Sequence, residues 1–295
     1  MDQEQLEIVR TGRGFFAALD QSGGSTPKAL LEYGLSESDW SSDEEMFDLV
    51  HAMRARIIAS PVFSGDRIIA TILFEGTMDR TVDGVGSAEY LWTRKRIVPF
   101  VKVDQGLADV EDGVQPMKPL DRLAGLLARA REQGVFGTKM RSVIKEAVPV
   151  GIDRVLDQQF EVARLILHAG LLPVLEPEVD IRSATRAKAD ELLVAGITRR
   201  LDALPPGSMV ALKLSLPARP GHYDDLMGHP GVVRVVALSG GYSRRDACSR
   251  LRENPGLIAS FSRALLEGLS AQQTPEEFDA ELGKAVQEIW SASNA

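Results

Sequence analysis

A lysine stands in the middle of an otherwise apolar stretch, VALKLSLP, at residues 210–217. The apolar neighbours of Lys213 predict a buried strand, and an unpaired ammonium group in a protein interior costs several kcal/mol unless it gives up its proton. A lysine held near its neutral form is a nucleophile that can attack a carbonyl carbon. Lys213 is therefore a candidate for covalent catalysis.

Ionisable residues also occur near the ends of other apolar stretches. Residues two positions apart in a strand point to the same face, so several of them share a face in pairs. The residues are Asp20, Lys102, Asp104, Lys139, Arg141, Glu176 and Glu178. For any one of these residues, a structural salt bridge in the interior explains the charge as well as a functional role does. The whole set exceeds what packing requires, because burying this much charge is costly unless function needs it.

Eight apolar stretches of strand length alternate with amphipathic patterns along the chain. The expected strands are residues 14–20, 67–75, 98–104, 135–141, 171–179, 209–216, 232–240 and 257–264. Apolar residues recur near i, i+3, i+4 and i+7 between them, which predicts helices. These helical patterns cover residues 42–59, 119–134, 153–170, 185–204 and 242–254, with a less clear one at 87–96. Gly134 and Gly170 end two of them, as expected for left-handed helix caps.

This alternation predicts a single closed barrel. Strand–helix repeats build right-handed units with parallel strands, and eight repeats in about 250 residues is the length of a (β/α)8 TIM barrel. We expect one α/β domain over residues 1–295, with an extra helix at about 3–11 and a C-terminal helix at about 275–291. Active sites of such barrels lie at the C-terminal ends of the strands, where the ionisable residues are expected to converge.

The composition restricts the class of protein. The 295 residues are 44% hydrophobic and 26% charged, with a formal net charge of -8. These values are typical of soluble globular proteins, and the acidity argues against nonspecific binding to nucleic acid or to anionic membranes. The N-terminus lacks a signal-peptide pattern, and no apolar run approaches the roughly 20 residues of a membrane span. We expect a cytoplasmic protein without nucleic-acid or membrane partners.

The sequence also argues against a metal or disulfide centre. Cys248 is the only cysteine, so it cannot form an intrachain disulfide or a thiolate zinc site, and its helical surroundings predict a packing role. None of the four histidines, at 51, 168, 222 and 229, falls at a predicted strand end. Because catalytic zinc sites usually rely on histidine ligands, we predict no metal and no other cofactor.

The last two expected strands supply a candidate phosphate site. Ser239, Gly240 and Gly241 end the seventh strand, and Arg263 is expected on the eighth. Many barrels bind phosphate through backbone N–H groups after these two strands, and glycine lets the backbone approach an anion closely. A lone SGG is more often a turn, but its position here favours phosphate binding.

Eight longer motifs run through the chain from residue 14 to about 265. They are AALDQSGGSTPKAL, ILFEGTMDR, FVKVDQGL, FGTKMRS, LLPVLEPEV, LKLSLP, VVALSGGYSR and ASFSRAL. Together they resemble the class I fructose-bisphosphate aldolases, particularly their short bacterial branch. The resemblance implies a metal-independent, Schiff-base lyase of glycolysis and gluconeogenesis. Such an enzyme reversibly cleaves fructose 1,6-bisphosphate to dihydroxyacetone phosphate and glyceraldehyde 3-phosphate.

The resemblance implies catalytic roles position by position. Lys213 looks like the Schiff-base lysine, and Glu176 looks like the general acid/base of carbinolamine dehydration and of the substrate hydroxyl proton. Asp20, Lys102 and Lys139 match charged residues that position substrate hydroxyls and influence Lys213. Burial and a second cation such as Lys139 would favour a neutral amine at Lys213. An apolar strand environment would bring the pKa of Glu176 near the working pH.

Further matches concern the support of this network and the two phosphates. Glu178 would hold the charged network in place, and Arg141 is expected among the substrate-binding residues. The ketone-side phosphate site is matched by Ser239, Gly240, Gly241 and Arg263. Ser22 and Ser25 are similar to serines near the other phosphate, although DQSGGS departs from the Asp-Glu-Ser-Thr-Gly-Ser run of animal members.

Other functions fit parts of the pattern. A transaldolase or a deoxyribose-phosphate aldolase shares the barrel and the lysine imine, and a barrel that only captures sugar phosphates would keep the charges without the chemistry. The long C-terminal tail with a tyrosine of animal members is absent from the sequence, so Glu176, another strand-end acid or water is expected to move the enamine proton. Preference between the bisphosphate and fructose 1-phosphate is undecided, and a homo-oligomer is compatible with the sequence.

Overall fold

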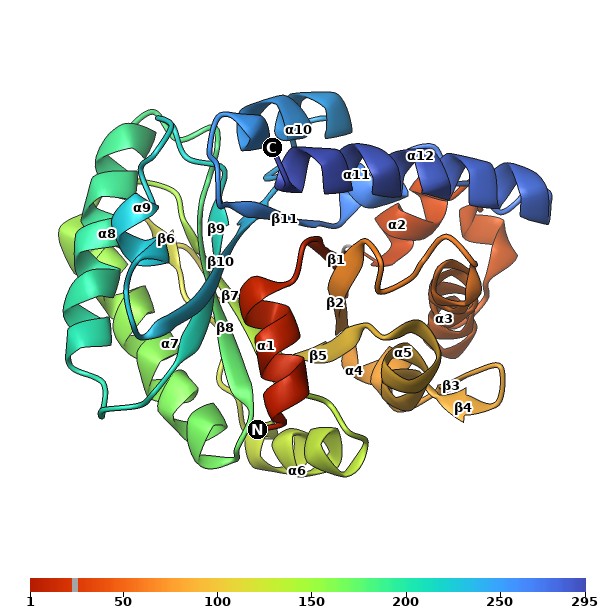
Figure 1. Ribbon diagram of the computed structural model, residues 1–295, viewed down its shortest axis with the longest axis horizontal. Helices are drawn as coiled ribbons and strands as arrows, with labels where there is room; N and C mark the ends of the chain where they lie inside the picture. The colour runs from red at the N-terminus through yellow and green to blue at the C-terminus, as the bar shows by residue number, and fades with distance from the viewer. Residues whose placement is uncertain (23–25) are drawn as a thin grey trace.

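The computed structural model describes residues 1–22 and 26–295, and within them eight parallel strands form a closed ring (Figure 1). In chain order the strands are β1 (Phe15–Leu19), β2 (Ile68–Leu73), β5 (Val98–Lys102), β7 (Gly137–Ile144), β8 (Leu172–Val179), β9 (Val210–Ser215), β10 (Val232–Leu238) and β11 (Ile258–Phe261). Each pairs in parallel with the next, and β11 pairs with β1 to close the ring. The predicted (β/α)8 barrel is confirmed.

Helices surround the ring of strands (Figure 1). The predicted helices between strands are α3 (Asp43–Ala59), α5 (Ser87–Lys95), α6 (Leu123–Glu132), α7 (Pro149–His168), α8 (Arg186–Asp202) and α10 (Arg244–Arg252). The terminal helices are α1 (Gln3–Thr11) and α12 (Pro275–Ser293). Among the described residues, no helix is both long and apolar enough to cross a membrane.

Several short elements were not predicted. They are α2 (Thr26–Glu32), η2 (Glu37–Asp39), α4 (Glu75–Met78), the hairpin of β3 (Thr81–Val82) and β4 (Val85–Gly86), β6 (Val114–Gln115), α9 (Asp224–Met227) and α11 (Arg263–Leu266). Elements of one or two turns are too short to show a hydrophobic period, so pattern analysis misses them. Most lie in the connections that follow strands, and β6 pairs antiparallel with the last two residues of β7.

Caps and glycines fix where the long helices begin and end. The hydroxyls of Ser42 and Thr274 each accept a hydrogen bond, at 3.2 Å, from the backbone N–H three residues later, at the starts of α3 and α12. Gly134 and Gly170 have φ values of 76° and 79° after α6 and α7. This left-handed conformation favours glycine, so the predicted caps are confirmed.

Alternation along the strands divides the apolar residues into two layers. Phe16 and Ala18 of β1 pack in the ring interior, whereas Ala17 and Leu19 pack against the helices. The ring centroids of Phe16 and Phe100 are 5.5 Å apart in the interior. The barrel is therefore filled by side chains below the level of the site, as expected for this architecture.

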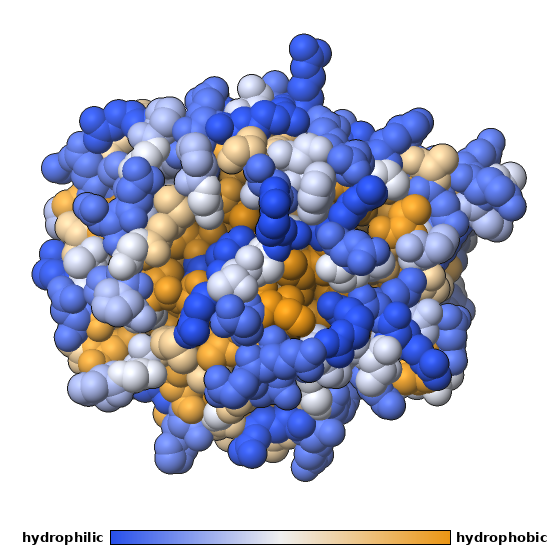
Figure 2. Space-filling view, in the orientation of Figure 1, coloured by the Kyte–Doolittle hydropathy of each residue, from blue (hydrophilic) through white to orange (hydrophobic). Residues whose placement is uncertain are grey.

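Helix α1 covers one end of the barrel, and in Figure 1 it lies in front of the ring of strands. Its buried residues Leu6 and Val9 join the interior cluster. Arg234 of β10 donates hydrogen bonds to the carbonyls of Arg10 (2.6 Å) and Gly12 (3.0 Å), which ties the end of α1 to the sheet. Figure 2 shows apolar residues gathered in the middle of this face and polar side chains around them. The opposite end, where the parallel strands finish, carries the site.

Candidate active site

The C-terminal ends of the strands surround a cavity of about 990 Å³. Every predicted site residue that the structure describes lines this cavity: Asp20, Ser22, Lys102, Lys139, Arg141, Glu176, Glu178, Lys213, Ser239, Gly240, Gly241 and Arg263. Ser25 lies outside the described residues. The fold thus brings together groups that are spread over more than two hundred residues of sequence.

Lys213 lies within β9 and is only 4% exposed. Its side chain points into the barrel because it alternates with Leu212 and Leu214, which pack in the outer layer. The Nζ atom is 3.2 Å from Oε1 of Glu176 on β8. The lysine is therefore nearly buried at the cavity and has a carboxylate directly beside it.

Lys139 is the centre of a second set of buried ion pairs. Its Nζ is 2.5 Å from Oδ2 of Asp20, 2.9 Å from Oε2 of Glu176 and 4.0 Å from Oδ2 of Asp104. Burial alone would lower the pKa of Lys139, but these carboxylates outweigh burial and raise it above its ordinary value. Lys139 is therefore a fixed cation, which links Asp20 to Glu176.

The two carboxylates respond in the opposite sense. Burial would raise the pKa of Asp20, yet Lys139, Lys213 and Lys102 hold it well below its usual range. Burial likewise would raise the pKa of Glu176, but Lys139 and Lys213 lower it. The expectation that an apolar environment brings the pKa of Glu176 near the working pH is wrong for the free protein. The amino groups of Lys139 and Lys213 lie 2.9 and 3.2 Å from this carboxylate, and they favour its ionised form.

Asp104 was counted among the ionisable strand-end residues, on the same strand face as Lys102, but it was assigned no role in the site. It is 6% exposed, and its Oδ1 is 2.6 Å from Nζ of Lys102. Its Oδ2 accepts a hydrogen bond from the backbone N–H of Arg141 at 3.2 Å. Because β5 and β7 set Lys102 directly beside Lys139, a carboxylate between these like charges offsets their repulsion.

Arg141 and Glu178 form a separate pair at the cavity wall. Nε of Arg141 donates to Oε2 of Glu178 at 2.6 Å. Burial works to lower the pKa of Arg141, but Glu178 and Glu176 raise it above its ordinary value. Glu178 thus supports the network through Arg141 on the neighbouring strand.

The loop after β10, residues 239–241, also lines the cavity. Gly240 and Gly241 have φ values of 61° and 104°, and a Cβ at position 240 would lie 2.7 Å from Cγ2 of Ile181. Both facts require glycine in this loop. Nη2 of Arg263 is 3.6 Å from the point that a Cβ of Gly241 would occupy, so a guanidinium group borders the loop.

The expected position of Arg263 on the eighth strand is wrong. β11 ends at Phe261, and Arg263 begins α11 instead. The apolar stretch continues past the strand end into this short helix, so hydrophobicity alone did not mark the boundary. The residue still lines the cavity, because α11 starts directly above the strand end.

Arg54 of α3 is a buried cation that the sequence did not mark as part of the site. Its side chain is 2% exposed, Nη1 donates to Oγ1 of Thr77 at 2.9 Å, and Nη2 donates to the carbonyl oxygen of Gln21. Burial lowers the pKa of Arg54 to about 10, although Asp20 acts to raise it. Arg54 therefore holds the backbone that follows Asp20. One arginine within a long amphipathic helix carries no signal of such a role.

The buried ion pairs predict that the free energy of unfolding decreases in acid. The depressed pKa values of Asp20 and Glu176 stabilise the folded state above their unfolded values of about 4, and this contribution is lost as pH falls through the folded values. The raised pKa of Lys139 contributes below about pH 10 and is lost only as pH rises through its folded value. Replacing Asp20 by asparagine should flatten the rise of unfolding free energy between about pH 2 and 4.

Urea denaturation at several pH values measures this slope. Asp109→Asn, at an exposed position, is the matched control and should keep the parental slope. An Asp20→Asn protein with the parental slope over the same pH range would contradict the ion-pair assignment.

Sequence comparisons agree with this geometry. A sequence model of the family described as Fructose-bisphosphate aldolase class-I matches residues 2–188. A fructose-bisphosphate aldolase class 1 from Synechocystis is 54% identical over 292 residues, covering 99% of this chain and 97% of the relative. One from Clostridium acetobutylicum is 55% identical over 293 residues, covering 99% of each.

The chain belongs to the class I fructose-bisphosphate aldolase family.

A solved structure with the same fold is the fructose-bisphosphate aldolase from Plasmodium falciparum, with a TM-score of 0.81 and 19% identity. The match covers 98% of this chain and 93% of that one. At this identity the similarity concerns the fold. It shows that the aldolase barrel is shared across members whose sequences have diverged widely.

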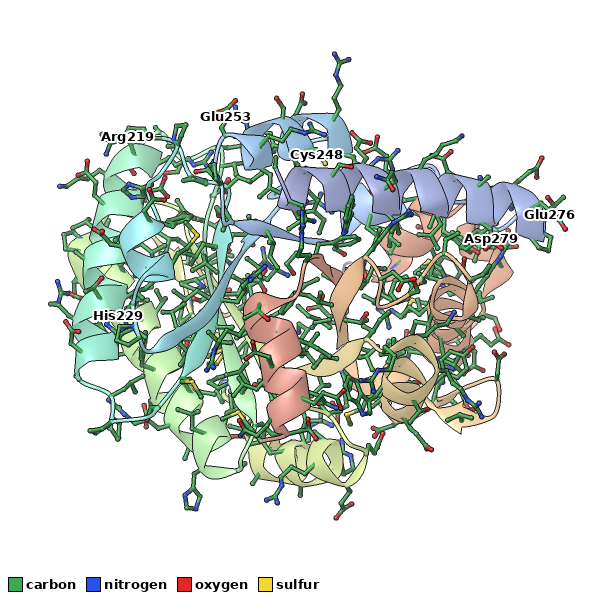
Figure 3. The ribbon with its side chains drawn as sticks, viewed as in Figure 1. Arg219, His229, Cys248, Glu253, Glu276 and Asp279 are labelled. Carbon is green, nitrogen blue, oxygen red and sulfur yellow. The ribbon has the colours of Figure 1, made fainter. Side chains whose placement is uncertain are left out.

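Neither the single cysteine nor any of the four histidines of this aldolase is among the described residues that line the cavity. Cys248 is buried in α10, where burial raises the pKa of its thiol to about 11, so the predicted packing role is confirmed. Figure 3 shows His229 at the periphery, and its Nε2 is 3.1 Å from Asp202. Within residues 1–22 and 26–295, no group of three or more His, Cys, Asp or Glu side chains is arranged to hold a metal ion.

Proposed function

We propose that this class I fructose-bisphosphate aldolase cleaves fructose 1,6-bisphosphate through a Schiff base on Lys213. The reaction is reversible and yields dihydroxyacetone phosphate and glyceraldehyde 3-phosphate, as in glycolysis and gluconeogenesis. One observation carries the proposal: a buried lysine amine lies 3.2 Å from a buried carboxylate at the end of the barrel that holds the cavity.

The first stage is formation of the imine. Glu176 takes a proton from the Lys213 ammonium group, and the free amine attacks the ketone carbon C2 of the sugar. Glu176 then returns a proton to the carbinolamine hydroxyl, which leaves as water. The lowered pKa of Glu176 means that its carboxylate is ionised and holds no proton at the start of the cycle.

The second stage is carbon–carbon cleavage. A base removes the proton of the C4 hydroxyl, the C3–C4 bond breaks, and its electron pair moves into the iminium to form an enamine. Glyceraldehyde 3-phosphate leaves as the aldehyde product. A proton then returns to C3, and water hydrolyses the imine to release dihydroxyacetone phosphate. Glu176 is our candidate for both proton transfers, because its carboxylate lies next to the imine nitrogen.

The other charged residues hold the substrate and the two reacting groups. Lys139 keeps Asp20 and Glu176 in place through contacts of 2.5 and 2.9 Å, and it offsets negative charge that develops on substrate oxygens. The sugar hydroxyls would lie along the cavity wall formed by Lys102, Arg141 and the supporting residue Glu178.

The phosphate groups are assigned to the two sides of the cavity. Backbone N–H groups of Ser239, Gly240 and Gly241, with the Arg263 guanidinium, would bind the ketone-side phosphate. Ser22 and Ser25 would bind the distal phosphate. The support for the first assignment is the left-handed glycine pair beside a cation.

The proposal includes no metal and no other cofactor, because the imine itself is the electron sink. We also propose a cytoplasmic location, supported by the acidic net charge of -8 and by a buried thiol as the single cysteine. The proposed partners are sugar phosphates, not nucleic acid or membranes. Sedimentation of the purified protein will establish whether it forms the homo-oligomer that the sequence allows.

Hydride trapping tests the proposed chemistry. Sodium borohydride added in the presence of dihydroxyacetone phosphate should reduce the iminium to a stable secondary amine. Peptide mass spectrometry should then find the adduct on Lys213, and the modified protein should have lost cleavage activity in proportion to labelling.

Two controls separate this mechanism from the alternatives. Cleavage should persist in the presence of a metal chelator, whereas a metal-dependent aldolase would lose activity. A barrel that only binds sugar phosphates would gain no adduct under borohydride. An adduct on a different lysine would overturn the assignment of Lys213.

A further inference from the structure

A cluster of contacts beside the proposed phosphate loop has no part in the mechanism above. It joins Arg186 at the start of α8, Tyr242 directly after Gly241, and Leu216 directly after β9. Nη1 of Arg186 donates to the Tyr242 hydroxyl at 3.0 Å, and Nη2 donates to the carbonyl oxygen of Leu216. One guanidinium group thus connects the phosphate loop to the strand that carries Lys213.

The loop itself needs such a support. Gly240 and Gly241 adopt consecutive left-handed conformations, and glycine gives the backbone access to many others. A turn hydrogen bond from the backbone N–H of Tyr242 to the carbonyl of Ser239, at 3.0 Å, closes the loop on itself. That bond fixes the internal shape of the loop but not its position relative to the strands.

Tyr242 is held on two sides. Its hydroxyl accepts the hydrogen bond from Arg186, and Cζ of Arg250 lies 4.5 Å from the centroid of its ring. Arg186 is itself well fixed: its side chain is 11% exposed, and Nε is 3.9 Å from Oδ2 of the buried Asp190. Asp190 also accepts a hydrogen bond from the backbone N–H of Ala218 at 3.1 Å. The tyrosine therefore joins the flexible loop to a rigid part of the barrel.

We infer that Tyr242, held by Arg186, is a positioning residue that fixes the Ser239–Gly241 loop against β9 and thereby sets the affinity for the ketone-side phosphate. Tyr242 also borders the cavity, and because its hydroxyl oxygen accepts from Arg186, we assign its effect on the substrate to the position of the loop. The inference rests on the proposed phosphate role of this loop. It identifies a specificity element that lies outside the charged catalytic cluster.

Replacing Tyr242 by phenylalanine tests this role, because the ring and its Arg250 contact remain. We expect KM for fructose 1,6-bisphosphate and fructose 1-phosphate to rise about tenfold while kcat stays within about twofold, since phosphate binding is lost equally from the ground and transition states. The value of kcat/KM for fructose 6-phosphate, which lacks the ketone-side phosphate, should not change. A purely structural role would instead weaken activity towards all three sugars alike, and that result would overturn the inference.

The contribution of Arg186 is tested by a double-mutant cycle. If Arg186 acts through Tyr242, then Tyr242→Phe should raise KM by much less in an Arg186→Gln background than in the parent. A full tenfold rise in that background would overturn the link. Tyr90→Phe is the matched control. The Tyr90 hydroxyl also forms a hydrogen bond with a charged side chain, donating to Asp83 at 3.0 Å, but it does so on an exposed surface. It should leave all three sugars unaffected.

Arg263→Met distinguishes failure of the inference from failure of the phosphate assignment. This variant should raise KM for the sugars with a ketone-side phosphate and spare fructose 6-phosphate. If Arg263→Met behaves so and Tyr242→Phe does not, the positioning role of Tyr242 is wrong and the phosphate site stands. If Arg263→Met leaves KM unchanged for every sugar, the phosphate assignment fails and the inference fails with it.

Discussion

Replacing Lys213 by methionine is expected to reduce cleavage of fructose 1,6-bisphosphate by at least about four orders of magnitude. Methionine has similar length and no amine, so the imine cannot form and the electron pair of the C3–C4 bond has no acceptor. Lys139 and Lys102 do not replace the lost amine, because each is engaged with buried carboxylates at distances of 2.5 to 2.9 Å. Steady-state assays with a coupled enzyme measure the loss, and hydride trapping should yield no adduct.

The Lys213→Met protein should remain folded. Glu176 keeps the contact of its Oε2 atom with Lys139 at 2.9 Å, so the substitution does not leave this carboxylate buried without a cation. Lys284→Met is the matched control: it removes a 72% exposed lysine that pairs with Glu281 at 3.2 Å on α12. The control should retain parental turnover. Turnover near the parental value in Lys213→Met itself would show that the reaction does not pass through this amine.

The barrel was readable from the sequence because its signals are long and repeated. Eight strands appear near the eight expected stretches, and Gly134 and Gly170 mark helix ends as expected. The errors occur where a prediction depends on the exact residue at which one element ends and the next begins. The motif ASFSRAL stays largely apolar through Leu265, so the change from β11 to α11 before Arg263 was not visible. Short helices such as α9 and α11 contain too few residues for a period to appear.

The site was readable as a set of residues but not as a set of contacts. Alternation within each strand placed Lys213 and Glu176 on inward faces, but it says nothing of which groups touch across strands. That depends on register, and in the structure Lys102 lies directly beside Lys139. This register explains why Asp104 is needed between them, a role that the sequence did not indicate. It also explains the wrong expectation for Glu176, whose pKa is decided by two neighbouring ammonium groups and not by apolar surroundings alone.

Arg54 and Tyr242 show a second limit of sequence reading. Both act on loops of the site from helices or turns whose sequence patterns are ordinary. Arg54 reaches the carbonyl of Gln21 from the middle of α3, and Arg186 reaches Tyr242 from the start of α8. Partners separated by 33 and 56 positions in the sequence are joined only by the closed geometry of the barrel. Charged residues in helices therefore need the fold before a role can be assigned.

Replacing Glu176 by glutamine should have the second largest effect, a fall in kcat of about 10²–10⁴. Glutamine has the same shape as the carboxylate but cannot accept a proton at neutral pH. In the proposed cycle Glu176 accepts the proton of Lys213, returns one to the carbinolamine and accepts the C4 hydroxyl proton. The substitution should therefore slow both formation of the imine and cleavage of the carbon–carbon bond. Rapid-quench trapping with borohydride measures the first rate, and single-turnover release of glyceraldehyde 3-phosphate measures the second.

The matched control for this substitution is Glu191→Gln. Glu191 also contacts two cations, Lys188 at 3.1 Å and Arg219 at 3.2 Å, but it does so on the exposed face of α8. The control also removes a carboxylate that contacts two cations, and it should keep the parental rates. Only the substitution at Glu176 should slow catalysis. Parental rates for both steps in Glu176→Gln would assign the proton transfers to another group. A slower imine step with an unchanged cleavage step would restrict Glu176 to the first stage and leave removal of the C4 proton to another base, with Asp20 the nearest candidate because it shares Lys139 with Glu176.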